Sequence, residues 1–252
     1  MFKLLPPAAV ILMLTHDALA ADPPPLEKHV FEDGGAKLPY HLLTPSKVED
    51  GKKYPLVVFL HGAGERGADN EKQLVHGVPQ FVANRDKFPC FLIAPQCPDG
   101  KKWVEVDWSA DTHTLPKDPG EVGRLALALI ERSIRELPVD PKRVYITGLS
   151  MGGYGTWDLV ARRPELFAAA APVCGGADEA TAARIKNVPV WAFHGAKDTA
   201  VKPARSRNMI AALEKAGGKP KYTEYPDVGH NSWDPAYKDP EVFKWLFAQK
   251  KE

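Results

Sequence analysis

The chain has few cysteines and no recognisable metal-binding pattern. Its three cysteines, Cys90, Cys97 and Cys174, permit at most one internal disulfide, and no two of them have the C-x-x-C spacing of a metal-ligand pair. We expect buried or incidental thiols, and whether Cys90 and Cys97 are oxidised stays open. Neither H-E-x-x-H nor a comparable set of ligands occurs, so the sequence predicts no metal and no other cofactor.

The chain also has no surplus of charge and no compositional bias. Its 33 basic residues nearly balance 32 acidic ones, the formal net charge is +1, and the basic residues are scattered. Because no basic stripe could follow a phosphate backbone, we expect no nucleic-acid partner. With 44% apolar and 26% charged residues, the composition excludes a disordered or fibrous protein and is typical of a folded globular one.

No apolar run reaches the roughly 20 residues needed to cross a bilayer. The run at residues 8–14 follows Lys3 and precedes Ala18-Leu19-Ala20, a pattern typical of a signal peptide and its cleavage site. We therefore expect residues 1–20 to be removed and the protein to be secreted or periplasmic, without stable membrane insertion. Residues 21–252 are predicted to form a single catalytic domain, whose oligomeric state is open.

Short apolar runs alternate with helical patterns along the chain. Residues 29–32 and 37–43 flank Asp33-Gly34-Gly35, a turn signal that predicts an antiparallel β-hairpin. The alternation predicts an α/β fold with a mostly parallel central sheet, helices on both faces and a ligand site beyond the carboxyl ends of the strands. The expected further strands are residues 55–60, 90–94, 144–147, 167–173, 190–193 and 222–225, and the expected helices are 120–137, 152–163, 203–216 and 239–249.

The strongest chemical signal is a G-x-S-x-G pattern centred on Ser150. It follows an expected strand and leads directly into an expected helix, as in the nucleophile elbow of α/β-hydrolases. Such a turn projects the serine hydroxyl above the sheet. It also places the Met151 amide at a helix start, where a free N–H favours an oxyanion. We predict Ser150 as nucleophile and Met151 as one oxyanion-hole donor.

A serine nucleophile needs a histidine base and a carboxylate to orient it. His230 follows the last expected strand and precedes the last expected helix, which suits the chain order serine, acid, histidine. Asp198, in the loop after residues 190–193, is the favoured acid. Asp178 is its rival, and Asp227 is too close to His230 in sequence. His194 precedes the acid, so we expect it to have a packing or hydrogen-bonding role.

The loop after residues 55–60 is rich in glycine and is the expected second half of the oxyanion hole. We favour the amide of Ala63, with Gly64 as the alternative, and expect His61 to support the loop. Three tryptophans, Trp103, Trp108 and Trp233, are predicted on loops at the rim of the site. Aromatic side chains there either line a substrate pocket or anchor the loops by packing, and both alternatives stay open.

From about Tyr54 to Ala248 the sequence resembles the α/β-hydrolase esterases grouped as predicted peptidases or phospholipase/carboxylesterase-like proteins, which are secreted. This family is related to polyhydroxybutyrate depolymerases and feruloyl esterases. The motifs that carry the resemblance are LHGAGERG at 60–67, APQCP at 94–98, GLSMGGYGTW at 148–157 and HGAKD at 194–198. The resemblance implies an α/β-hydrolase fold, a serine hydrolase with the triad named above and no cofactor.

The function that these patterns favour is hydrolysis of a small-molecule or polymer-linked carboxylic ester through an acyl-enzyme. A serine peptidase or amidase and an acyltransferase use the same triad and remain alternatives, because the shape of the pocket decides between them. A catalytically silent binding protein on this fold is a hypothesis of another class. It predicts a missing triad member, and the sequence lacks none.

Overall fold

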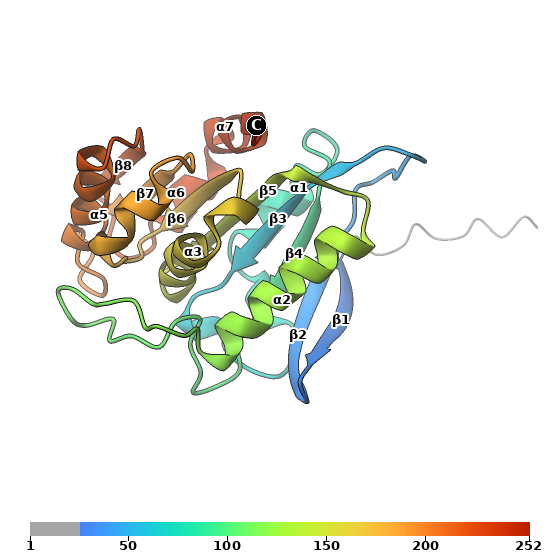
Figure 1. Cartoon of the computed structure of the whole chain (residues 1–252), viewed down its shortest axis with the longest axis horizontal. Helices are drawn as coiled ribbons and strands as arrows, with labels where there is room; N and C mark the ends of the chain where they lie inside the picture. The colour runs from blue at the N-terminus through green and yellow to red at the C-terminus, as the bar shows by residue number, and fades with distance from the viewer. Residues whose placement is uncertain (1–25) are drawn as a thin grey trace, which may run out of the picture.

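A computed structural model describes residues 26–252, which form one eight-stranded sheet. The spatial order of the strands is β1-β2-β4-β3-β5-β6-β7-β8 (Figure 1). All neighbours from β4 to β8 in this order are parallel, whereas β2 is antiparallel to both β1 and β4. The strands are β1 Leu26–Asp33, β2 Ala36–Leu43, β3 Tyr54–Leu60, β4 Phe91–Pro95, β5 Val139–Leu149, β6 Ala169–Val173, β7 Trp191–Gly195 and β8 Lys221–Tyr225.

The antiparallel entry to the sheet is the predicted hairpin. Strands β1 and β2 pair from Leu26 opposite Leu43 to Asp33 opposite Ala36. Gly34 and Gly35 connect them with φ angles of 59° and 82°. Two successive residues with positive φ make the tight turn whose twist matches that of the strands, and glycine adopts this conformation without steric cost.

Helices cover both faces of the sheet, as predicted. Those on one face are α2, α3, α4 and α5, and those on the other are α1, α6 and α7 (Figure 1). The short helices α1, α4 and α6 were not predicted. The helices are α1 Val78–Ala83, α2 Glu121–Glu136, α3 Met151–Arg162, α4 Ala182–Ile185, α5 Ala204–Lys215, α6 Trp233–Lys238 and α7 Pro240–Ala248, and 3-10 turns occur at Ala63–Glu65, Lys72–Leu74, Pro164–Leu166 and Glu179–Thr181.

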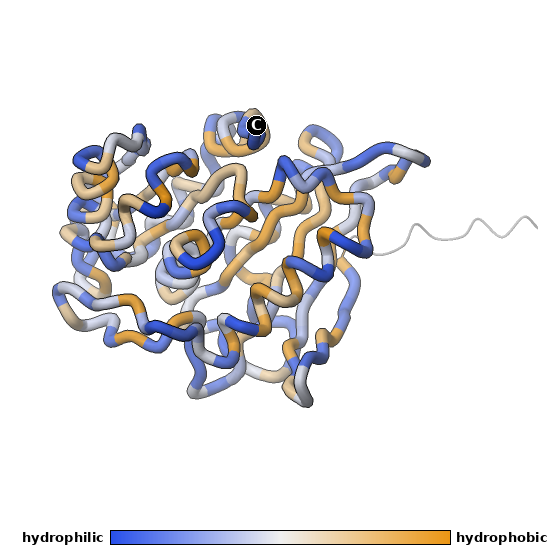
Figure 2. The backbone as a smooth tube through the Cα atoms, viewed as in Figure 1, coloured by the Kyte–Doolittle hydropathy of each residue, from blue (hydrophilic) through white to orange (hydrophobic). Residues whose placement is uncertain are grey.

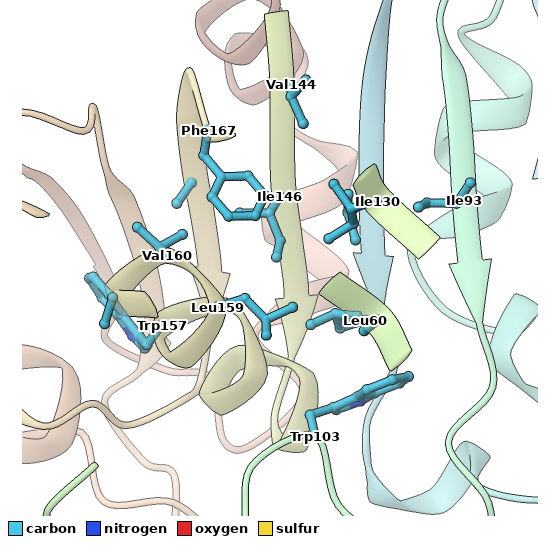
Figure 3. Close-up of a cluster of buried hydrophobic side chains, with 14 of the residues drawn as sticks. Leu60, Ile93, Trp103, Ile130, Val144, Ile146, Trp157, Leu159, Val160 and Phe167 are labelled. Atoms are coloured by element: carbon cyan, nitrogen blue, oxygen red, sulfur yellow. The ribbon is translucent and has the colours of Figure 1, made fainter. Parts of the chain in front are cut away.

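The core lies in two layers, one on each face of the sheet. Along β3, Val58 and Leu60 contact the layer that contains α2 and α3, whereas Val57 and Phe59 contact the opposite layer. This alternation follows from the two-residue period of a strand. The apolar central strands lie inside the molecule, and the more hydrophilic segments lie around them (Figure 2). Figure 3 shows Leu60 packed in the first layer.

Most of the elements expected from the sequence are present, but some begin or end at other residues than expected. The strand expected at 167–173 begins only at Ala169, and the strand expected at 144–147 extends over Val139–Leu149. None of the helices among residues 26–252 is long and apolar enough to span a membrane. The predicted signal peptide, residues 1–20, lies outside the described residues, so the division into residues 1–20 and 21–252 stays a prediction.

Candidate active site

Ser150 occupies a strained turn between β5 and α3. Its backbone angles are φ 53° and ψ −117°, which a residue with a side chain rarely adopts. The turn requires glycine on both sides. A Cβ atom on Gly148 would lie 2.5 Å from the Gly152 carbonyl oxygen, and a Cβ on Gly152 would lie 1.9 Å from the Leu60 carbonyl oxygen. The spacing of the motif is therefore a consequence of the close approach of β3, β5 and α3.

The three predicted triad residues lie together at the carboxyl ends of β5, β7 and β8. His230 Nε2 is 2.9 Å from Ser150 Oγ, and His230 Nδ1 is 2.7 Å from Asp198 Oδ2. Because an ionised carboxylate only accepts hydrogen bonds, the Nδ1 atom carries the proton that Asp198 accepts. The neutral ring then presents a lone pair on Nε2 to the serine hydroxyl. This arrangement is the one needed for general-base activation of a serine.

Asp198 is held on both of its carboxylate oxygens. Oδ1 accepts hydrogen bonds from the amides of Ala200 and Val201 at 2.8 and 2.9 Å. Oδ2 contacts His194 Nε2 at 3.2 Å as well as His230. Burial acts to raise the pKa of Asp198, but the hydrogen bonds from His194, His230 and Val201 outweigh it and hold this pKa well below its usual range. The acid is therefore ionised at neutral pH.

His194 is a buried residue that contacts Asp198 and is not part of the triad. It is fully buried, its Nε2 atom is 2.9 Å from the Val201 carbonyl oxygen, and its Nδ1 atom is 2.7 Å from Ser206 Oγ. Since a carbonyl only accepts, Nε2 donates to Val201, and the Ser206 hydroxyl also lies 3.2 Å from the Gly175 carbonyl oxygen, to which it donates. The sequence predicted a hydrogen-bonding role for His194 but missed its contact with Asp198.

The loop after β3 lies against the nucleophile turn and is held by His61. His61 Nδ1 donates to the Gly62 carbonyl at 2.6 Å, and Nε2 accepts from the Cys97 amide at 2.8 Å. Ala63 and Gly64 are the first residues of the 3-10 turn Ala63–Glu65, so their N–H groups have no partner within the turn. Both predicted donors thus remain candidates, and the expected supporting role of His61 matches its hydrogen bonds.

Trp103 is a core residue, which corrects its assignment as a substrate contact. Its side chain is 1% exposed, its Nε1 atom donates to the His61 carbonyl at 2.9 Å, and it packs near Leu60 (Figure 3). A Cβ atom on Gly155 would lie 2.6 Å from the Trp103 Cβ, so the tryptophan also sits tightly on α3. Trp103 therefore anchors its loop by packing, the second of the two alternatives predicted for it.

The other two tryptophans are only partly buried, and they stay predicted substrate contacts. Trp233 begins α6, and its ring meets the His230 ring edge-on with centroids 5.4 Å apart. It also contacts His76, whose Nε2 atom is 4.0 Å from a carboxylate oxygen of Glu65. Trp108 packs against a small apolar cluster that includes Tyr154. The indole N–H groups of Trp108 and Trp233 are buried without a hydrogen-bond partner among the described residues.

The rival acids have structural roles. Asp178 accepts hydrogen bonds from the amides of Ala180 and Leu115, so it caps the turn at Glu179–Thr181 and holds the loop before α2. Asp227 is exposed and pairs with Lys197 at 2.7 Å. Neither of them hydrogen-bonds to His230. A large cavity does not mark the active site. One cavity of about 730 Å³ is lined by residues such as Arg184, and none of the triad residues lines it.

All three cysteines are buried, one of the two expectations for them, and all three are free. Burial raises the pKa of Cys174 to about 12, so this residue is a neutral thiol at physiological pH. Within residues 26–252, one set of three His, Cys, Asp or Glu side chains is close enough to hold a metal ion. It consists of Cys174, Asp198 and His230, whose ligand atoms all lie within 4.8 Å of one another.

The strand order, the strained serine turn and the linked Ser150, His230 and Asp198 side chains define a protein with the α/β-hydrolase fold. Comparison with family models gives the more specific result. The model described as the Dienelactone hydrolase family matches residues 113–239, about half of the chain. The chain belongs to this family.

Individual relatives include esterases and depolymerases. The chain is 30% identical to poly(3-hydroxyalkanoate) depolymerase C of Paucimonas lemoignei over 48% of this chain and 28% of that protein. It is 24% identical to a probable carboxylesterase of Oryza sativa subsp. japonica over 75% and 76% of the two chains. A solved thermostable esterase has a TM-score of 0.83 and 40% identity, covering 90% of this chain and 64% of that one.

The chain thus spans less than two thirds of the length of the depolymerase and of the thermostable esterase. A solved ferulic acid esterase, with 18% identity, a TM-score of 0.63 and coverage of 88% and 96%, supports the fold alone.

Proposed function

We propose that the protein hydrolyses carboxylic esters through an acyl-enzyme on Ser150. The observation that carries the proposal is the pair of linked hydrogen bonds, 2.9 Å from His230 Nε2 to Ser150 Oγ and 2.7 Å from His230 Nδ1 to Asp198 Oδ2. The names of the relatives, among them carboxylesterases, favour an ester over an amide. The substrate is a small-molecule or polymer-linked ester.

The proposed reaction has two halves. Ser150 Oγ attacks the ester carbonyl while His230 Nε2 takes the hydroxyl proton, and the resulting oxyanion accepts hydrogen bonds from the amides of Met151 and of Ala63 or Gly64. His230 then gives its proton to the leaving alcohol. In the second half, water gives a proton to Nε2 and attacks the acyl-enzyme. His230 then returns that proton to Ser150 Oγ as the bond to the acyl group breaks, which releases the acid and restores both residues. Asp198 stabilises the imidazolium in both halves.

The test is turnover of p-nitrophenyl acetate, butyrate and octanoate, methyl ferulate and acetylated xylan by the wild type and by Ser150→Ala. We expect the substitution to lower kcat on the order of 10⁶-fold, because it removes the nucleophile on which the triad acts. Ser46→Ala, at an exposed position, is the matched control and should leave kcat unchanged. Labelling of the wild type by a fluorophosphonate, lost only in Ser150→Ala, checks the nucleophile independently.

Two results would contradict the proposal. Unchanged turnover by a folded Ser150→Ala variant would exclude this serine. Absence of turnover on every ester, with Ser150 still labelled by the probe, would favour an amidase or an acyltransferase on the same triad.

We also propose that the protein is exported with residues 1–20 as its signal peptide. The support is the short apolar run at residues 8–14 followed by Ala18-Leu19-Ala20. Expression of the full chain in a bacterial host, followed by fractionation and N-terminal sequencing, tests this proposal. A mature protein that begins at Ala21 outside the cytoplasm is the expected result, and an uncleaved chain in the cytoplasm would contradict it.

A further inference from the structure

Cys174 is a nucleophilic side chain that the proposed reaction does not use, although it lies directly beneath the triad. It follows β6, with an unusual φ of 39°, and its amide donates to the Phe193 carbonyl of β7 at 2.8 Å. The Ser232 side chain lies beside its sulfur, and the nearby Ser150 amide donates to the Val173 carbonyl at 2.9 Å. Its surroundings are therefore the same residues that build the active site.

We propose that Cys174, Asp198 and His230 form a binding site for a thiophilic divalent cation such as Zn²⁺ or Cd²⁺, and that the bound ion switches the triad off. The sulfur, carboxylate and imidazole ligand atoms lie within 4.8 Å of one another. Zinc bonds of about 2.0–2.3 Å hold ligand atoms roughly 3.5 Å apart. The widest pairs therefore close by up to about 1.3 Å on binding, whereas His230 Nδ1 and Asp198 Oδ2, now 2.7 Å apart, separate slightly if Nδ1 is the ligand.

The chemistry of the set matches such an ion. A thiolate, a carboxylate and a neutral imidazole together carry two negative charges, which balance a divalent cation, and sulfur with nitrogen favours the softer metals. Binding displaces the proton of the Cys174 thiol, which passes to water. Ser232 Oγ, fully buried beside the sulfur, is a further polar atom that the fold places there.

The site is preorganised but not closed. The Oδ1 atom of Asp198 stays bound to two backbone amides, so Oδ2 is free to exchange its histidine contacts for an ion without loss of the side-chain position. Cys174 and Asp198 are buried, whereas the His230 side chain is 28% exposed. His230 is therefore the ligand of the three that an ion in solution meets first.

An ion bound to either ring nitrogen of His230 stops the reaction. An ion on Nε2 occupies the lone pair that accepts the proton of Ser150. An ion on Nδ1 displaces the Asp198 hydrogen bond and leaves the ring proton on Nε2, so this nitrogen can no longer act as a base. The inhibition rests on the proposed function, in which His230 is that base, but the binding itself does not.

The experiment measures binding and turnover separately. Purified protein with chelator removed is titrated with Cd²⁺, and the ultraviolet charge-transfer band of a Cd²⁺–thiolate bond is recorded beside turnover of p-nitrophenyl butyrate. We expect one equivalent of Cd²⁺ to produce the band and to inhibit the wild type. Cys174→Ser should lose the band and need at least ~10-fold more Cd²⁺ for half-inhibition, measured against its own metal-free activity. Cys90→Ser and Cys97→Ser, which change the other buried thiols, should behave as the wild type.

The outcomes separate the two proposals. A wild type without the thiolate band, or a Cys174→Ser variant that is inhibited at the same Cd²⁺ concentration as the wild type, would overturn the inference. A Cys174-dependent band in a protein that hydrolyses no ester would uphold the metal site while contradicting the proposed function. An excess of chelator should restore turnover, which distinguishes a bound ion from metal-induced precipitation.

Discussion

Asp198 accepts the Nδ1 proton of His230, and asparagine in its place should move that proton to Nε2. The Oδ1 position faces two amide donors, so the asparagine oxygen takes that place and its NH₂ group faces His230 Nδ1. An NH₂ group donates, which forces the ring proton onto Nε2 and removes the base. We expect Asp198→Asn to lower kcat roughly 10⁴-fold, measured with p-nitrophenyl butyrate under saturating substrate.

Asp227→Asn is the matched control, because Asp227 is the exposed acid close to His230 in sequence. It should keep the kcat of the wild type, and circular dichroism should show that both variants are folded. If Asp198→Asn kept kcat within about tenfold of the wild type, the acid would have to be assigned elsewhere.

The positions of single residues were predictable from sequence where a residue follows directly after a strand. Ser150, Asp198 and His230 each follow an apolar strand, and parallel strands bring their carboxyl ends to one edge of the sheet. The contact of Cys174 with the triad and the burial of Trp103 depend on how distant segments pack. No local pattern reports such packing, so those two features had no signal in the sequence.

At the scale of elements, the packing of α3 against β3 leaves no room for a side chain at Gly152. A Cβ atom there would lie 1.9 Å from the Leu60 carbonyl oxygen, so Gly152→Ala must move backbone. We expect the free energy of unfolding to fall by about 2 kcal/mol or more, measured by urea denaturation. Turnover should fall as well, because the Ser150 turn shifts with the helix.

Gly64→Ala is the control for the same chemical change, since a Cβ atom there meets no other atom within 4 Å. It should leave the free energy of unfolding nearly unchanged. Equal unfolding free energies for Gly152→Ala and the wild type would show that the close approach of α3 to β3 is not rigid.

Long elements were predictable and short ones were not. Helices α2 and α5 run for 16 and 12 residues, long enough for apolar positions to repeat at the helical period. Helices α1 and α6 have 6 residues and α4 has 4, less than two turns each, so no period can be recognised. Their formation is decided by packing on the sheet, which acts between residues far apart in sequence.

For the whole molecule, buried histidines couple folding to pH. Burial lowers the pKa of His61 from 6.5 to about 4, a cause that outweighs its hydrogen bond to the Gly62 carbonyl. Nε2 accepts from the Cys97 amide, so a second ring proton would point at another donor. Between these two pKa values His61 is protonated in the unfolded chain but not in the folded protein. The free energy of unfolding therefore falls as the pH falls through this range.

The loss can be measured as a difference between two pH values. With pKa values of 6.5 unfolded and about 4 folded, His61 makes the protein about 2 kcal/mol less stable near pH 5 than near pH 7. His61→Gln keeps an acceptor for the Cys97 amide but has no titrating ring. Between pH 7 and pH 5, the unfolding free energy of this variant, measured with urea, should therefore fall by about 2 kcal/mol less than that of the wild type. The partly exposed His29, changed to glutamine, should retain the wild-type pH dependence. If His61→Gln lost as much stability as the wild type, the linkage would have to arise from other groups, with His113 the first to examine, because burial also lowers its pKa to about 4.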